Sequence, residues 1–107
     1  MPLIRIEFDD EVVSDGDARS LSEVVRIIVS EETGIEDVFV YANAARIKVQ
    51  IAPIEIFIEM SAPKIADADD LFARIKKRLS EWKGRRAFSH PINLTLIPMN
   101  WKFETGI

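Results

Sequence analysis

The sequence contains no cysteine and only one histidine in 107 residues. Without cysteine, the chain has no disulfide framework, no thiolate zinc site and no cysteine nucleophile. The single histidine, His90, lies beside a proline in a predicted loop, and one histidine without any cysteine argues against a transition-metal site. We therefore expect neither a metal site nor a bound cofactor.

The sequence also lacks long apolar runs and an excess of positive charge. Fourteen Lys and Arg against eighteen Asp and Glu give a net charge of −4, which provides no general attraction to a phosphate backbone. The amino terminus carries Arg5, Glu7, Asp9 and Asp10 where a signal peptide would be apolar. We expect a cytoplasmic protein that binds neither nucleic acid nor a membrane.

What is present is an ordinary globular composition, 48% hydrophobic and 30% charged. A chain of 107 residues is long enough to bury one hydrophobic core without metals or disulfides. The sequence therefore predicts a single domain over residues 1–107.

The first elements follow from hydrophobic periodicity. Apolar residues alternate with charged ones over residues 2–8, which predicts a half-buried strand. A helix is predicted over about residues 18–33, because Ser20 and Glu23 have capping-box spacing before a helical apolar pattern. Gly34 is well suited to end this helix in the left-handed conformation.

Two further β segments are predicted after this helix. Residues 38–41 are β-branched or aromatic and predict a second strand. Residues 46–51 alternate Ile47, Val49 and Ile51 with polar side chains and predict a short β-ribbon.

The second half repeats the pattern of the first. Residues 53–60 alternate like the first strand, and a helix with acidic residues from Asp67 onward is expected to end at Gly84. A last strand is predicted over residues 92–97, closed by Pro98.

The order of elements therefore indicates an internal repeat, with one β-α-β unit in residues 2–52 and another in residues 53–107. The predicted fold class is α/β, a two-layer α+β sandwich in which the two units form one four-stranded sheet with two helices on one face. Two architectures share this element order. One is the ferredoxin-like sheet with antiparallel strands in the order 4-1-3-2, and the other is a pseudo-symmetric sheet in which each half is parallel.

Several short features resemble the tautomerase superfamily, which includes 4-oxalocrotonate tautomerase, macrophage migration inhibitory factor and malonate semialdehyde decarboxylase. Met1–Ile4 opens directly into a strand, and Pro53 opens the second half. Gly34 precedes the second strand, residues 61–64 (SAPK) follow the third, and residues 100–107 (NWKFETGI) form an aromatic end. The layout and length are similar to those of fused members with two β-α-β units, in particular short bacterial ones.

This resemblance implies an activity. In the family, removal of the initiator methionine leaves an amino-terminal proline, here Pro2, whose amine is the general base or acid. A free α-amine has a pKa of about 8, and burial disfavours its charged form, so the amine can accept a proton at working pH. The resemblance further implies a homotrimer that moves a proton on a small oxo- or enol-carboxylate substrate.

The predicted carboxylate-binding residues depart from the family. Its arginines fall after the first strand and in the strand after the first helix, where this chain has Glu11 or Val12 and Phe39. The candidate substrate-binding residues are therefore the cations Arg46, Lys48 and Lys64 and the polar Asn93. Arg46 and Lys48 have the alternative role of a solvated strand face.

The aromatic tail has two interpretations. Trp101 and Phe103 are expected either to line the substrate pocket or to pack against a neighbouring subunit. Pro2 likewise has the alternative role of a strand-entry proline, like Pro53. For the whole protein, the alternatives are a catalytically inactive tautomerase-fold protein and a ferredoxin-like ligand-binding or regulatory module.

Overall fold

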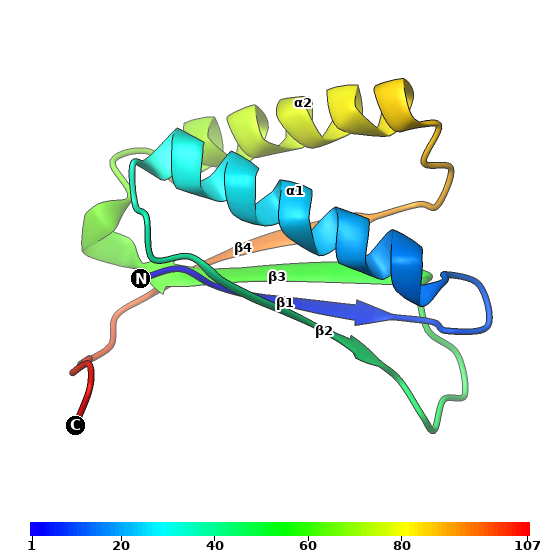
Figure 1. Cartoon of the computed structure of the whole chain (residues 1–107). Helices are drawn as coiled ribbons and strands as arrows, with labels where there is room; N and C mark the ends of the chain where they lie inside the picture. Colours follow the sequence, from blue (N-terminus) through cyan, green and yellow to red (C-terminus); the bar gives the residue numbers. More distant parts are fainter.

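The computed structural model describes residues 1–107 as a four-stranded sheet with both helices on one face (Figure 1). Along the chain, its elements are β1 (Leu3–Phe8), α1 (Asp15–Thr33), β2 (Phe39–Ala44), β3 (Ile54–Ser61), the 3-10 turn η1 (Ala62–Lys64), α2 (Ala68–Arg86) and β4 (Asn93–Met99). Neither helix combines the length and apolar character needed to cross a membrane.

The strand order distinguishes between the two predicted architectures. The strands lie in the order β2-β1-β3-β4. Within each half the two strands are parallel, β1 with β2 and β3 with β4, and the halves meet through the antiparallel pair β1 and β3. The pseudo-symmetric two-layer sandwich is therefore confirmed, and the ferredoxin-like alternative is wrong because its neighbouring strands are all antiparallel.

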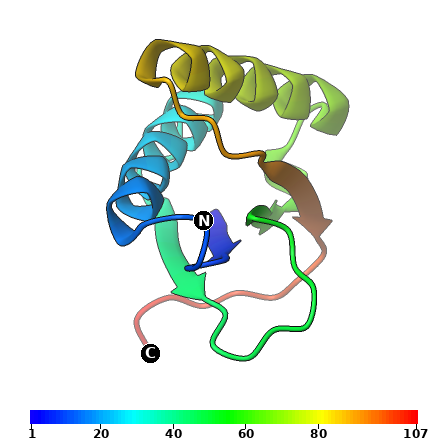
Figure 2. The ribbon, with the colours of Figure 1, turned by 90° about the vertical axis from the view of Figure 1, so that its right-hand side faces the viewer.

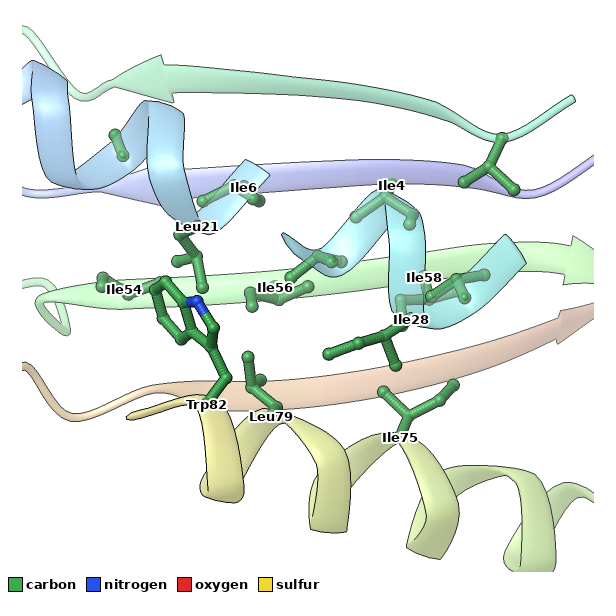
Figure 3. Packing of buried hydrophobic residues seen from close by; sticks show 14 of the residues in the cluster. Ile4, Ile6, Leu21, Ile28, Ile54, Ile56, Ile58, Ile75, Leu79 and Trp82 are labelled. Atoms are coloured by element: carbon green, nitrogen blue, oxygen red, sulfur yellow. The ribbon is translucent and has the colours of Figure 1, made fainter. Parts of the chain in front are cut away.

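The core lies between the sheet and the helices. The alternation predicted for the two central strands is confirmed, because every second residue of β1 and β3 is buried. Figure 3 shows these side chains meeting the apolar faces of both helices. The labelled members are Ile4, Ile6, Leu21, Ile28, Ile54, Ile56, Ile58, Ile75, Leu79 and Trp82.

The first helix begins earlier than predicted. Ser14 caps it, with Oγ accepting a hydrogen bond from the Asp17 amide at 3.1 Å, so the predicted capping box at Ser20 is wrong. The additional residues place the carboxylates of Asp15 and Asp17 in the first turn, which suits the positive amino-terminal end of a helix. Gly34 ends the helix at φ 72°, as predicted.

Two predicted ends in the second half are also wrong. Helix α2 continues past Gly84 to Arg86, and its cap residue Ala87 adopts a left-handed φ of 51°. The last turn of α2 is basic, which suits the carboxyl end of a helix. Strand β4 continues through Pro98 to Met99, because an edge strand has one side on which a missing N–H is tolerated.

The ribbon predicted over residues 46–51 does not form within the chain. The segment is a loop between β2 and β3, and Figure 2 shows it on the side of the sheet away from the helices. Backbone hydrogen bonds from Ala45 N to Phe8 O (3.2 Å) and from Asp9 N to Pro53 O (3.0 Å) fix its two ends. The alternating pattern alone is insufficient, because a strand also needs a neighbouring strand to pair with.

Candidate active site

The topology brings Pro2 to one end of the sheet, beside three other segments. Phe39, at the start of β2, pairs with Leu3 because β1 and β2 are parallel. The last residues of β3 reach the same end because β3 runs antiparallel to β1, and Ser61 pairs there with Met99 of β4. Figure 1 shows the amino terminus beside the end of β3.

Pro2 is held firmly in this position. It is less than 2% exposed, and its carbonyl oxygen accepts a hydrogen bond from the Phe39 amide at 3.1 Å. Its nitrogen is joined to Met1 in an amide bond and is therefore not basic. Proton transfer at Pro2 requires that Met1 be removed.

The two strand-opening prolines are not structurally equivalent. Pro2 occupies an inward position of the alternation, in step with the buried Ile4 and Ile6. Pro53 immediately precedes the buried Ile54 and is therefore one step out of phase and only half-buried. The two halves thus place only Pro2 against the core.

Three of the predicted substrate-binding residues lie toward the same end as Pro2. Lys64 ends η1 directly after β3, and its side chain is exposed. Trp101 and Phe103 follow the end of β4, and their stacked rings lie 6.3 Å apart between centroids. Trp101 is half-buried and Phe103 is 50% exposed, so the tail of a single chain leaves much aromatic surface open.

The other three predicted residues lie at the opposite end of the sheet. Arg46 and Lys48 belong to the loop after β2, and Asn93 is the first residue of β4. The six residues of β1 separate the two ends by about 20 Å at the usual rise of a strand. Asn93 donates a hydrogen bond from Nδ2 to Glu55 Oε1 at 2.8 Å. Within one subunit, these residues do not meet Pro2.

Lys48 has partners that the sequence did not reveal. Its Nζ donates hydrogen bonds to Asp10 Oδ1 at 2.6 Å and to Asp9 Oδ1 at 2.7 Å, and its side chain is only 16% exposed. These carboxylates raise the pKa of the Lys48 ammonium, and the hydrogen bond from Lys48 lowers the pKa of Asp9. The only sequence signal was the acidic run directly after the first strand.

The face of the sheet away from the helices also carries an unpredicted residue at its centre. The Arg5 guanidinium lies 4.8 Å from the centroid of the Phe57 ring. Its nearest carboxylates are at 3.7 Å, from Nη2 to Glu59 Oε1, and 3.8 Å, from Nε to Glu7 Oε1. The buried Nε has no hydrogen-bond partner. This face therefore presents an arginine whose hydrogen-bonding capacity is not filled within the chain.

Four hollows of the chain do not include Pro2. One of about 430 Å³ lies between α1 and the outer edge of β2, and one of about 310 Å³ lies between α2 and β4. Two of about 370 Å³ each lie along the groove between α1 and α2. No group of three or more His, Asp or Glu side chains is placed to hold a metal ion.

Several solved structures have folds similar to that of this chain. No protein-family model and no curated protein matches the chain. A fused 4-OT symmetric trimer superposes with a TM-score of 0.70 at 11% identity, covering 98% of this chain and 94% of that one. A malonate semialdehyde decarboxylase inhibited by 3-bromopropiolate gives 0.65 at 18% identity, covering 98% and 91%. A macrophage migration inhibitory factor-like protein from Entamoeba histolytica gives 0.64 at 16% identity, covering 96% and 95%.

This chain has the tautomerase-superfamily fold. The resemblance predicted from the Met-Pro opening and the repeated β-α-β units is thereby confirmed for the fold. At these identities the likeness concerns the arrangement of the backbone, and the activity of a tautomerase-fold protein has to be argued from its own residues.

Proposed function

We propose that this tautomerase-fold protein is a cofactor-independent, cytoplasmic isomerase that moves a proton on a small oxo- or enol-carboxylate, with Pro2 as general base and acid once Met1 is removed. The observation that carries the proposal is the position of Pro2. Its ring is buried against the core, and its carbonyl is fixed by the Phe39 amide. An amine held there is oriented by the fold and shielded from water on the side of the core.

The chemistry needs a nitrogen that is neutral before the reaction and charged during it. Burial disfavours an ammonium group, so a freed Pro2 amine has its pKa shifted toward the working pH. The amine removes the proton of the enol hydroxyl, and the electron pair of the O–H bond forms the carbonyl. The electron pair of the C=C bond then takes the proton back from the resulting ammonium at the adjacent carbon. Neither step needs an external electron carrier.

The substrate carboxylate needs a cation in the same pocket. Lys64 is the cation of the same subunit that lies at the Pro2 end of the sheet. Arg46, Lys48 and Asn93 are assigned to substrate binding through a neighbouring subunit, because they lie at the other end of their own sheet. Trp101 and Phe103 are proposed as apolar walls of the pocket.

A homotrimer is proposed as the working assembly. None of the four hollows described above includes Pro2, so a closed pocket there is expected to take walls from a second copy. The fused 4-OT of the same fold is a trimer.

The proposal is tested on two forms of the untagged protein, separated by intact mass. The form without Met1 is expected to accelerate ketonisation of phenylenolpyruvate, and the form that retains Met1 is expected to be inactive. Equal activity in both forms would contradict a role for the Pro2 amine, since an amide nitrogen is not a base.

A second candidate rests on a specific feature of the sequence. Glu11 or Val12 and Phe39 stand at the positions where the family has its arginine pair. Because those arginines bind the substrate carboxylate, the second candidate is a tautomerase-fold protein that binds a ligand without catalysing a reaction. Ligand binding without product formation by the form that lacks Met1 would favour this candidate.

A further inference from the structure

The face of the sheet away from the helices carries a row of three different side chains next to Pro2. Leu3 follows Pro2 and pairs with Phe39 of β2 on one side and with Glu59 of β3 on the other. Paired residues of neighbouring strands point to the same face of a sheet. Leu3 is out of phase with the buried Ile4, so its face is the one away from the helices. The three side chains therefore lie across this open face, directly beside Pro2.

The β2 half of the open face is apolar and accessible. Phe39 is 52% exposed, and Tyr41, two residues further along the same strand, is 45% exposed. Leu3 is half-buried beside them. Large apolar side chains that gather on one accessible surface are typical of a contact site. This half is therefore suited to an apolar group bound next to Pro2.

The part of the open face around β3 is negatively charged. The Glu59 side chain is only 22% exposed, and its nearest cation is Arg5, whose Nη2 lies 3.7 Å from Glu59 Oε1. Arg5 is shared with Glu7, whose Oε1 lies 3.8 Å from the Arg5 Nε. Both contacts are longer than a direct hydrogen bond. One arginine balances only one of the two carboxylates, so a negative charge remains on this part of the face.

A substrate reaches Pro2 from the open face or from the end of the sheet. The opposite side of Pro2 is closed by the core, and its ring is less than 2% exposed. Lys64, which follows β3 at the same end, is the cation that the proposed function assigns to the substrate carboxylate. The rest of the molecule then lies over the row beside Pro2, where it meets both the apolar surface of Phe39 and the charge of Glu59.

We infer that Phe39 and Glu59 make this site select an enol acid with one carboxylate and an apolar group on the adjacent carbon, and reject an enol acid with a second carboxylate there. Phe39 and Leu3 cover the apolar group. Glu59 repels a second carboxylate, and because its side chain is largely buried, water screens this repulsion less than at an exposed position. The inference rests on the proposed function and names the substrate class of the same site.

Two enols that differ in one group provide the test. Phenylenolpyruvate and the enol of oxaloacetate share the enol and the first carboxylate, and the adjacent carbon carries a phenyl group in one and a second carboxylate in the other. In protein free of Met1, after subtraction of spontaneous ketonisation, kcat/KM is expected to be about a hundredfold higher for the phenyl compound. Equal values, or a preference for the dicarboxylate, would overturn the inference and leave the proposed function standing. No turnover of either enol would overturn both.

The role of Glu59 is tested by a nearly isosteric change. Glu59→Gln is expected to raise kcat/KM for the dicarboxylate about tenfold and to change that for the phenyl compound little, because only the repulsion is removed. Glu7→Gln is the matched control. It removes the other carboxylate near Arg5, but Glu7 pairs with Glu55, further along β1 from Pro2, so the ratio should stay as in the wild type. An unchanged ratio in Glu59→Gln, or the same change in Glu7→Gln, would contradict the role of Glu59.

The role of Phe39 is tested by changes of polarity. Phe39→Arg is expected to shift the ratio by about a hundredfold toward the dicarboxylate, because a cation replaces the apolar surface, whereas Phe39→Leu is expected to keep the wild-type preference. Circular dichroism checks that each variant folds. If Phe39→Arg does not fold, Phe39→Gln gives the same test, with an expected shift of about tenfold. A folded Phe39→Arg or Phe39→Gln variant with the wild-type ratio would overturn the role of Phe39.

Discussion

The carbonyl oxygen of Pro2 accepts a hydrogen bond from the Phe39 amide at 3.1 Å, across the first rung of β1 and β2. This contact does not involve the nitrogen of Pro2, so removal of Met1 leaves it intact. The freed amine is therefore expected to stay at the end of the sheet, close to the position it occupies in the full chain.

The first prediction concerns this amine. Pro2→Ala in protein free of Met1 is expected to lower kcat/KM for phenylenolpyruvate by about two to four orders of magnitude, the usual contribution of a general base. Pro53→Ala is the matched control, because Pro53 opens the other half of the sheet and has no free amine. Circular dichroism should show both variants folded. Equal activities would contradict the assignment.

The second prediction concerns the binding of the substrate carboxylate. Replacement of Arg46 or Lys64 by Gln is expected to raise KM about tenfold or more with a small change in kcat, because a cation holds the carboxylate in both ground and transition states. Lys76→Gln, on the exposed surface of α2, is the control. Steady-state kinetics with a substrate lacking the carboxylate should show no difference between variant and wild type.

The third prediction concerns the aromatic tail. Trp101 is half-buried in the single chain and is expected to become buried in the trimer, so its fluorescence should shift to longer wavelength when the protein is diluted to monomer. A Trp82→Phe variant removes the signal of the other tryptophan, which is already buried. An emission spectrum independent of protein concentration, in a protein that does dissociate, would contradict the predicted packing.

The fourth prediction concerns the pH dependence of folding. Lys48 lowers the pKa of Asp9 from its usual 3.8, and Arg74 lowers the pKa of Glu32 from 4.5, so both carboxylates stabilise the fold above those values. That stability is lost as the pH falls through the lower folded-state values. The pKa of Lys48 is raised from 10.5, so its contribution is present below that pH and lost as the pH rises through the folded value. Urea unfolding is expected to show a plateau between about pH 5 and 10, and Lys48→Met should lessen the slope on both sides.

The fifth prediction concerns the core. Ile56 is fully buried at the centre of the β1 and β3 pair, so Ile56→Ala is expected to lower the free energy of unfolding by about 2 to 5 kcal/mol. Val12→Ala, at a position 52% exposed, is expected to change it by less than about 0.5 kcal/mol. Urea titration of the two variants gives the comparison directly.

The central strands could be predicted from the sequence because their pattern is local. Apolar residues at every second position from Ile4 and from Ile54 are enough to define one buried face, and Gly34 is enough to end a helix. The start of the first helix was not predicted correctly, because more than one residue before its apolar pattern can act as a cap. Ser14 caps it rather than Ser20, and its Oγ accepts a hydrogen bond from the Asp17 amide.

The strand order, the absence of a strand partner for residues 46–51 and the positions of the candidate site residues were decided only by the tertiary structure. The alternation of Ile47, Val49 and Ile51 is as regular as that of a true strand, but strand formation depends on hydrogen bonds to a neighbour that local sequence does not specify. Likewise, no spacing along the chain predicts that Lys48 meets Asp9 while Pro2 lies at the opposite end of the sheet. The sequence by itself determined which residues are apolar, where helices can form and that a proline opens the first strand. Distances between segments far apart in the chain depend on how the two halves pack, because that packing is chosen by burial of the whole core.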